Sequence, residues 1–493
     1  MVQMESVHGV AMRYRHLQAL ALLPLAPLAL ACGAAPEPAL EAAAEPPRRV
    51  FLITVDTLRA DHLGWHGYPR DTSPRLDEWV ERGIVFERAI VQWPKTGPSF
   101  ASMFTSLYPH TTGLINTAAQ TIPDDYLALP AWFQERGFTT AAVISNPVLS
   151  RELGWGRGFD RYEQTWVDQA TLDAIDDLPV EQRPMAFRRH VWADRVNELA
   201  APLLASLASE ERLFVWLHYT DPHAPYLLQP GTANPFIDDE HYTSEEIVDL
   251  TGAEGRALGD QRELRYYVAQ YDANVWVTDR AIGGILDEIA TLGMEDGSLF
   301  VLTSDHGEEL DEHGVPFEHG PVPYNSSVHV PLVVVGAPSA SAGRRVEQPV
   351  ELIGLFPTLV ELLGEPMPEG FEGRSWSPLL RERPQAHEAE TGTDSDPIAF
   401  ADAGAYRRHL RSIQDGEWQL VLRPPNRDRE KPTIELYHLP SDPLQLTDVA
   451  SEFPEVRDRL GRQLSRWIRD SPQNVTPHTE AARKALEAMG YLE

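Results

Sequence analysis

The sequence predicts an α/β protein with a large, mostly parallel central sheet flanked by helices and a smaller C-terminal α+β subdomain. Over residues 49–384, short apolar runs rich in β-branched residues alternate with helix-like stretches. This alternation is typical of parallel strands buried on both faces. Beyond residue 398, the apolar runs are separated by turn-forming pairs such as Asp415-Gly416 and Pro424-Pro425, which indicates short strands joined by turns.

Five apolar runs are expected to form the central sheet: residues 50–55, 139–144, 213–217, 299–303 and 331–335. Six stretches between or beside them have helical patterns: residues 73–82, 100–107, 126–136, 193–207, 263–292 and 352–363. Continuous apolar runs of this length suit strands, whereas the longer periodic stretches suit helices.

The C-terminal part is expected to hold four short strands and one amphipathic helix: residues 399–401, 409–414, 418–423 and 433–438, then 453–470. A polar stretch at 385–396 is predicted to be a loop. These patterns divide the chain into a main domain (49–384), a C-terminal subdomain (385–475) and a peripheral tail (476–493).

The first 48 residues have the layout of an export signal followed by a tether. Basic residues precede an uncharged, Leu/Ala-rich run at 17–31, which is shorter than the ~20 residues of a spanning helix and is typical of a signal peptide. The run ends in Leu-Ala-Leu-Ala-Cys, which resembles a bacterial lipobox and makes Cys32 the predicted lipidation site; an ordinary cleaved signal is the alternative. Signal 1–32 and tether 33–48 then predict a lipoprotein of the bacterial periplasm, outer membrane or cell surface.

Composition excludes several classes of protein. Asp and Glu total 74 against 42 Lys and Arg, so the formal net charge is −32. This charge opposes binding to a nucleic-acid backbone. The single cysteine excludes an intramolecular disulfide framework and a thiolate zinc cluster. A bound metal would therefore have oxygen and imidazole ligands.

Polar residues follow four of the predicted strands: Asp56, then Ser145-Asn146, then His218, Asp221 and His223, then Asp305-His306. Ligands bind at the carboxyl ends of strands in such sheets. A carboxylate at the end of a buried strand is costly unless it is paired or bound to a metal. The predicted ligands of a divalent cation are therefore Asp56, Asp305 and His306. The alternative for Asp56 is a helix cap or an ion pair. The alternative for Asp305 and His306 is a turn. Glu308 and Glu309 are predicted to be solvated or to lie behind the ligands.

Thr96 is the candidate nucleophile. It lies in Trp-Pro-Lys-Thr-Gly-Pro-Ser, just before a predicted helix, where free N–H groups and the helix dipole favour an anionic substrate. A metal would lower the pKa of the hydroxyl and favour its attack. The alternative is that Thr96 or Ser99 only caps the helix.

Five segments together resemble the sulfatase family of the alkaline-phosphatase superfamily: residues 55–64 (VDTLRADHLG), 96–99 (TGPS) with 106–113 (SLYPHTTG), 217–226 (LHYTDPHAPY), 304–308 (SDHGE) and 435–443 (ELYHLPSDP). The resemblance implies that Asp56, Asp305 and His306 bind a metal beside the nucleophile at Thr96. It also implies that His223 contacts the substrate or protonates the leaving group. His319 takes the place of a substrate-contacting Lys or His.

The sequence also departs from the family pattern. Sulfatases oxidise a Cys or Ser to formylglycine, but Thr96 occupies that position, so no formylglycine is expected. Phe100 replaces the Arg of the signature, and Lys95 could replace its contact with the anion. Thr57 replaces a second Asp of the N-terminal pair. Threonine is the nucleophile in related phosphodiesterases and phosphoethanolamine transferases, which resemble a two-metal design.

A second ion could be held by Asp221, His223 and His319, and Asp221 is also predicted to contact substrate. Asn146 is a candidate substrate contact, although Asn before Pro147 is also typical of a turn.

The resulting functional hypothesis is a metal-dependent hydrolase of sulfate or phosphate esters, with Ca, Mg, Mn or Zn as the cation. Two alternatives stay open. One is an inactive sulfatase-like lipoprotein that binds an anionic glycan or lipid headgroup. The other is a transferase of a phospho-headgroup. The expected partners are a small-molecule or glycan ester and, through the anchor, a membrane.

Overall fold

The computed structural model describes residues 45–115, 121–166, 174–175, 177–179, 182–238, 245–251, 256–338, 342–381, 398–404, 410–423 and 432–470. They belong to one compact unit, Ala44–Glu493. The predicted signal, Cys32, most of the tether, the 385–396 loop and the 476–493 tail lie outside the described residues, and the domain boundaries stay predictions. None of the described helices has the length and apolar character needed to cross a bilayer.

The predicted mostly parallel central sheet is confirmed. Its order is β10-β2-β9-β6-β1-β5-β3-β4, and β11 also pairs with β2. The strands are β1 (Arg49–Val55), β2 (Gly83–Ile90), β3 (Thr139–Ile144), β4 (Arg161–Gln164), β5 (Leu213–Tyr219), β6 (Ser298–Ser304), β9 (His329–Val335), β10 (Arg344–Val346) and β11 (Val350–Glu351). Only β9 runs antiparallel to its neighbours β2 and β6.

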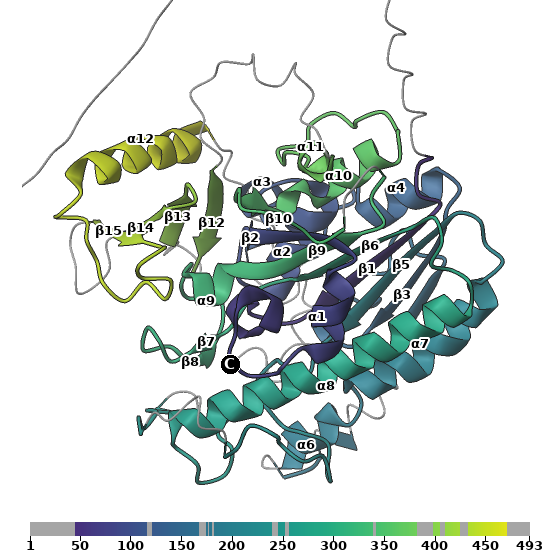
Figure 1. Cartoon of the computed structure of the whole chain (residues 1–493), viewed down its shortest axis with the longest axis horizontal. Helices are drawn as coiled ribbons and strands as arrows, with labels where there is room; N and C mark the ends of the chain where they lie inside the picture. The colour runs from purple at the N-terminus through teal and green to yellow at the C-terminus, as the bar shows by residue number, and fades with distance from the viewer. Residues whose placement is uncertain are drawn as a thin grey trace, which may run out of the picture. The chain divides into compact units, whose positions relative to one another are not determined.

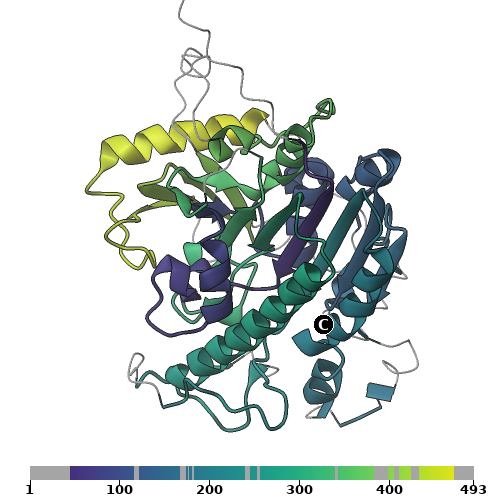
Figure 2. The same ribbon diagram turned by 45° about the vertical axis from the view of Figure 1, so that its right-hand side comes forward.

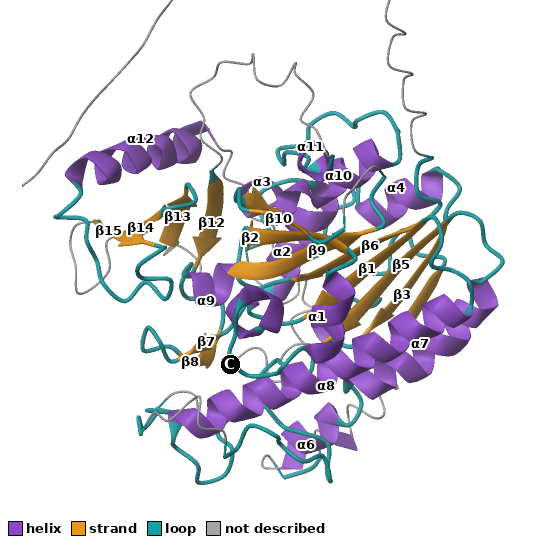
Figure 3. Cartoon of the chain, in the orientation of Figure 1, coloured by secondary structure: helices purple, strands orange, loops and turns teal. Residues whose placement is uncertain are grey.

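Helices cover both faces of the sheet (Figures 1 and 3). The described α-helices of this region are α1 (Pro74–Val80), α2 (Thr96–Thr105), α3 (Pro109–Thr112), α4 (Leu129–Glu135), α6 (Arg183–Arg188), α7 (Ala193–Leu207), α8 (Leu264–Thr291), α9 (Asn325–Val328), α10 (Leu355–Leu362) and α11 (Ser377–Leu380). One apolar core lies between the sheet and α1, α7 and α8. The other lies between the sheet and α2, α4 and α10.

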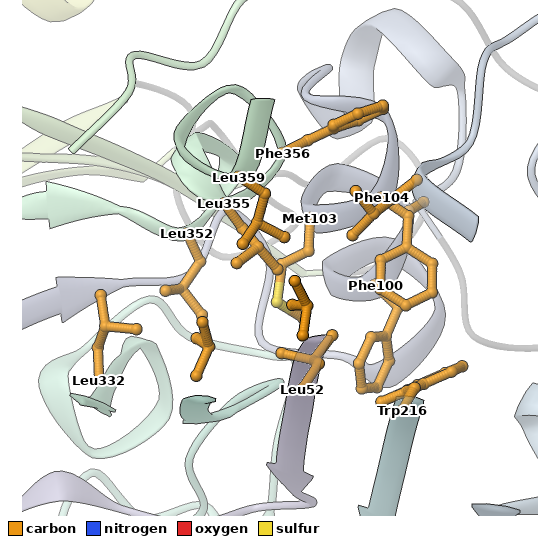
Figure 4. Close-up of a cluster of buried hydrophobic side chains, with 14 of the residues drawn as sticks. Leu52, Phe100, Met103, Phe104, Trp216, Leu332, Leu352, Leu355, Phe356 and Leu359 are labelled. Carbon is orange, nitrogen blue, oxygen red and sulfur yellow. The ribbon is translucent and has the colours of Figure 1, made fainter. Parts of the chain in front are cut away.

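Helix α2 is buried along its whole length. Phe100 and Phe104 lie 4.8 and 4.9 Å from the ring of Trp216, and Met103 points toward Leu355 and α10 (Figure 4). A helix embedded in this way is held rigidly by close packing. Its first residue, Thr96, is therefore fixed relative to the ends of the central strands.

The C-terminal region is an antiparallel sheet covered by one helix. Its strands are β12 (Ala399–Ala403), β13 (Leu410–Gln414), β14 (Trp418–Arg423) and β15 (Thr433–His438), in sequential order. Helix α12 (Pro454–Asp470) packs on this sheet through Leu460 and Leu464. The first strand lies close to the main sheet, since Asp402 N–H donates to Gln92 O at 2.9 Å.

The register of the central strands brings their polar ends together. Val55 at the end of β1 pairs with Ser304 of β6 on one side and with Tyr219 of β5 on the other. Asp56 therefore emerges beside Asp305 and beside the segment that follows β5. A two-stranded ribbon, β7 (Glu309–Leu310) with β8 (Pro316–Glu318), follows β6 and leads to His319.

Candidate metal and catalytic site

The structure brings the three predicted metal ligands together. Single ligand atoms of Asp56, Asp305 and His306 all lie within 4.8 Å of one another, and no other such acid, histidine or cysteine group occurs in the described parts of the chain. His306 Nε2 is 3.4 Å from Asp305 Oδ2 and 3.8 Å from Asp56 Oδ1. All three side chains are completely buried.

The electrostatics of this cluster fit a cation. Asp56 Oδ1 and Asp305 Oδ2 are buried without a hydrogen-bond partner. Burial opposes ionisation of Asp56, but His223, His218 and His306 outweigh burial and hold its pKa well below the usual value. Burial, followed by the charge of Asp56, raises the pKa of Asp305 well above normal. Two adjacent buried carboxylates are unfavourable unless a positive charge lies between them.

The imidazole of His306 is oriented for ligation. Its Nδ1 lies 2.9 Å from Gly307 O, and a carbonyl accepts a proton, so Nδ1 donates and Nε2 presents its lone pair to the two acids. Carboxylate oxygens with one imidazole nitrogen suit Mg, Mn, Ca or Zn to differing degrees. The residues present therefore fit a divalent cation.

Asn146 and His218 lie behind Asp56. Asn146 Nδ2 donates to Asp56 Oδ2 at 2.5 Å, and its Oδ1 accepts from Val148 N–H, so the turn before Pro147 and a role at the site coexist. His218 Nε2 faces the same Asp56 oxygen across 3.7 Å and has no hydrogen-bond partner. His218 Nδ1 is 2.9 Å from Thr54 Oγ1.

Sequence reasoning assigned no role to His218. The signal lay in the strand pairing, because His218 of β5 is the direct neighbour of Thr54 of β1. Residues paired in adjacent strands share one face of a sheet. His218 therefore lies on the same face as Thr54, two residues before Asp56.

Thr96 lies next to the metal cluster. It is the first residue of α2, it is buried, and its Oγ1 is 3.4 Å from His306 Nε2. The side chain makes no N-cap hydrogen bond, because the N-cap residue is Lys95. The hydroxyl thus faces the candidate cation site at a helix N-terminus, where N–H groups attract an anion.

His223, His319 and Lys95 line the same region. The His319 ring stacks on His306 at 4.3 Å and meets His223 edge-on at 5.0 Å. Lys95 is half-buried and packs against Gly320, where a side chain would collide with it. Burial lowers the pKa of Lys95, and also those of His223 and His319.

The structure decides between the two expectations for the glutamates after His306. Glu308 and Glu309 are completely buried, so the option of solvated side chains is wrong. Glu308 Oε1 lies 3.1 Å from His319 Nδ1, and Glu309 accepts hydrogen bonds from Ser326 and Ser327. Glu308 therefore orients His319, a role that a charged side chain in a polar stretch of sequence does not reveal.

Asp221 has no described contact with the other predicted site residues. Its buried carboxylate lies near Arg188, Asp194 and the Ala193 N–H, and no described hydrogen bond or ion pair joins it to Asp56 or His319. Its pKa is raised to about 6, mainly by burial. Its proposed contact with substrate and the second metal stay predictions.

Two of the three departures from the family signature, Phe100 and Thr57, are structural features here. The Phe100 ring packs in the core, edge-on to His218 at 5.2 Å, so it offers no contact to an anion. Thr57 Oγ1 donates to its neighbour's carbonyl, Asp56 O, at 2.7 Å. Thr57 has a positive φ of 56°, and its hydroxyl proton is turned toward the backbone.

Comparisons with known proteins agree with this geometry. The sulfatase family model matches residues 48–365. Iduronate 2-sulfatase of Mus musculus is 25% identical over 65% of this chain and 69% of its own length. The ulvan-active sulfatase of Formosa agariphila is 23% identical over 86% of this chain and 81% of its own length. The crystal structure of the phosphonate monoester hydrolase of Agrobacterium radiobacter has the same fold, with a TM-score of 0.66 and 20% sequence identity. The match covers 86% of this chain and 96% of the hydrolase.

The family match spans both strand ends that carry Asp56 and the Asp305-His306 pair, and it includes Thr96. Iduronate 2-sulfatase and the ulvan-active sulfatase are ester hydrolases by name, and the buried acid and histidine cluster of this chain lies at the carboxyl ends of its own central strands. The chain belongs to the sulfatase family and is an ester hydrolase.

Proposed function

We propose that the protein is a metal-dependent hydrolase of sulfate or phosphate esters that uses Thr96 as its nucleophile. The observation that carries the proposal is the 3.4 Å contact between Thr96 Oγ1 and His306 Nε2. It puts a buried hydroxyl at the edge of the acid and histidine cluster. A bound divalent cation would act there as a Lewis acid and lower the pKa of the hydroxyl.

The side chains of this site support an in-line displacement. The N-terminus of α2 and Lys95 hold the anionic ester group. Thr96 first releases its hydroxyl proton to water. Oγ1 then attacks the sulfur or phosphorus, an Oγ1–S or Oγ1–P bond forms, and the bond to the leaving oxygen breaks. His223 or His319 donates a proton to that oxygen, and Glu308 keeps the His319 ring in place. Water cleaves the threonyl ester and regenerates the hydroxyl.

The substrate class follows from the charge and polarity of the site. Two histidines, a lysine and a helix N-terminus suit a tetrahedral anion. The relatives named iduronate 2-sulfatase and ulvan-active sulfatase support a sulfated sugar as the substrate. The structural likeness to a phosphonate monoester hydrolase supports a phosphorus ester as the substrate. We further propose export and anchoring through Cys32, as the signal-like sequence indicates.

Activity assays across aryl sulfates, aryl phosphates and aryl phosphonates, each with Ca, Mg, Mn and Zn, test the proposal. Thr96→Ala should lower kcat at least 1,000-fold, because loss of a nucleophile removes a step that the rest of the site cannot replace. Ser102→Ala is the matched control: it removes a buried hydroxyl from the same helix and should leave kcat nearly unchanged. Full turnover by Thr96→Ala would refute the role of Thr96.

A further inference from the structure

The ribbon of β7 and β8 carries a histidine at its tip, outside the predicted site. His313 lies between the two strands, and its side chain is 10% exposed. Its Nδ1 is 2.7 Å from Glu309 Oε2, at the start of the ribbon. Its Nε2 is 3.0 Å from Leu444 O, which belongs to the C-terminal region. The two nitrogens of one ring therefore join the ribbon to the C-terminal region.

Both of these neighbours are hydrogen-bond acceptors. Leu444 O is a backbone carbonyl, and Glu309 Oε1 accepts hydrogen bonds from the hydroxyls of Ser326 and Ser327. A neutral imidazole has only one N–H, so an imidazolium is needed to donate to both partners. The proton between the ring and Glu309 belongs to the ring, because the reference pKa of imidazole is about two units above that of a carboxyl group. The two serine hydroxyls stabilise the carboxylate further.

Two acids of the same ribbon favour the charged ring. Burial opposes the charge of His313, but the hydrogen bond to Glu309 and the charges of Glu309 and Glu312 outweigh burial and raise its pKa above the usual value. On the other side, the Tyr324 ring stacks on His313 at 3.9 Å. Burial raises the pKa of Tyr324 to about 12, so this neighbour stays neutral.

The segment 435–443, one of the five that resemble the sulfatase family, holds this stacked tyrosine. Glu435 accepts a hydrogen bond from the Tyr324 hydroxyl at 2.8 Å. Glu435 also forms an ion pair with Arg423, so the two charges behind the tyrosine compensate each other. The C-terminal region thus contacts His313 in two ways, through the stacked ring and through the carbonyl.

The turn that contains this carbonyl also binds α9. Asp442 closes the turn by accepting hydrogen bonds from two backbone N–H groups beyond it, at 3.0 and 2.8 Å. Gln445 Oε1 accepts the N–H of Asn325, the first residue of α9, at 2.7 Å. Figures 1 and 2 show the C-terminal region, in yellow-green to yellow, beside the part of the molecule that contains α9, which Figure 1 labels.

Both α9 and the ribbon lead directly to the site. In α9, Ser327 O accepts the Gly307 N–H at 2.8 Å, and Ser326 O accepts the Glu308 N–H at 2.9 Å. In the ribbon, β8 pairs with β7 and ends one residue before His319. A displacement of the tip of the ribbon therefore moves His319 relative to Glu308, the residue that orients it.

We propose that protonated His313 is a positioning residue that locks the ribbon to the C-terminal region and thereby holds His319 in the site. The His313 lock consists of the hydrogen bonds of the ring to Glu309 and to Leu444 O. A ring that loses a proton turns a lone pair toward one of these acceptors, and that hydrogen bond is lost. The lock is complete at low pH and is lost as pH rises through the pKa of His313 in the folded protein. This inference rests on the proposed function, because it concerns how pH regulates that site.

Glu309→Gln separates the charge of His313 from its hydrogen bonds. The amide oxygen can still accept from the two serine hydroxyls, while the amide nitrogen donates to Nδ1. The neutral ring then donates only through Nε2, to Leu444 O, and keeps both contacts at high pH. The ratio of kcat for Glu309→Gln to kcat for the parent should be about 1 at pH 6 and should rise about 10-fold or more by pH 10, since a displaced group at the site costs up to ~100-fold. The titrations of the other site residues occur in both proteins and cancel in this ratio.

His313→Gln removes the lock at every pH. Its kcat should be about 10- to 100-fold below that of the parent at pH 6, and the difference should disappear at pH 10, where the parent has also lost the lock. The matched control is His438→Gln, the same substitution at a half-buried histidine of segment 435–443 that binds Ser441. Its kcat should equal that of the parent at each pH.

Nitrogen NMR of protein labelled with ¹⁵N-histidine follows the protonation of the ring without a substrate. The His313 signals are those absent from His313→Gln. They should titrate above pH 6.5, the usual midpoint of histidine, in the parent and below it in Glu309→Gln. Because this measurement needs no turnover, it decides on the charged ring even if the proposed ester hydrolysis fails. A parent ring that titrates at or below this midpoint, a kcat ratio that is constant with pH, or a His438→Gln profile like that of His313→Gln would each overturn the inference.

Discussion

Replacing Asp305 by Asn should have opposite effects on the metal-free protein and on metal binding. Asp305 and Asp56 are both completely buried, and each has an oxygen without a hydrogen-bond partner. Without a cation, burial and the charge of Asp56 penalise ionisation of Asp305. An uncompensated buried charge costs about 3–5 kcal/mol. In EDTA at pH 7, Asp305→Asn should therefore raise the free energy of unfolding by up to about 3 kcal/mol.

Metal should cancel most or all of this difference. At a cation concentration 1,000 times the parent's Kd, binding adds about 4 kcal/mol to the free energy of unfolding. Residues behind metal ligands change affinity about 10- to 100-fold, so loss of a direct carboxylate ligand should cost at least 100-fold. At the same concentration, the variant should then gain only about 1.4 kcal/mol.

Asp272→Asn is the matched control. Asp272 is also completely buried, but it accepts hydrogen bonds from His62, Tyr68 and Arg70 at 2.7–2.8 Å. Its removal leaves Arg70 without this buried partner and should cost about 3–5 kcal/mol with or without metal. Guanidinium denaturation of the three proteins in EDTA and in metal measures all of these values. The reasoning is refuted if Asp305→Asn destabilises the metal-free protein, or if its gain from metal equals the parent's.

Two further predictions concern residues around the site. His218→Phe keeps an aromatic ring but removes the nitrogen that faces Asp56, so the metal Kd should rise 10- to 100-fold by calorimetry; an unchanged Kd would exclude His218 as a support for Asp56. Burial raises the pKa of Glu351 to about 7, although it accepts hydrogen bonds from Tyr108 and the Phe400 N–H. Because the folded state binds this proton more tightly than the unfolded state, stability should fall as pH rises from about 4.5 to 7. At pH 8, the free energy of unfolding of Glu351→Gln should therefore exceed that of the parent by on the order of 2 kcal/mol. At pH 4 this gain should be absent. A gain that is independent of pH would contradict this assignment.

Much of the fold follows from local patterns. Residues 139–144, 193–207, 418–423 and 433–438 form the predicted elements without a shift of boundary. Each has either a continuous apolar run or an apolar periodicity, and burial of the apolar side chains enforces the expected structure. The start of α2 differs more, because the prediction begins at Phe100 and the helix begins at Thr96. Gly97 and Pro98 are residues that usually interrupt a helix, but proline is tolerated in the first turn of a helix.

Strand β2 and the direction of β9 could not be predicted. The Glu87-Arg88 pair interrupts the apolar pattern of β2, and the structure has a register shift between Phe86 and Ala89 there. A bulge places extra residues outside the alternation, so no simple period shows it. The direction of β9 depends on which strands flank it, which is a property of the whole sheet.

The residues predicted to form the site are those that follow a strand or begin a helix. The residues that were missed are those whose role depends on how strands pair. Asp56, Asp305, His306 and Thr96 lie together because each ends a strand or starts a helix at one edge. The role of Glu308 depends on the ribbon of β7 and β8, which returns His319 to it over 11 residues. A contact of that kind requires the fold before it can be seen.

Anomalous diffraction from crystals grown with Mn²⁺ tests the central claim most directly. The account predicts one strong peak at ~2.0–2.6 Å from oxygens of Asp56 and Asp305 and from His306 Nε2, with Thr96 Oγ1 turned toward it. A saturated crystal with no peak among these three side chains, or with its only peak elsewhere on the protein, would contradict the account.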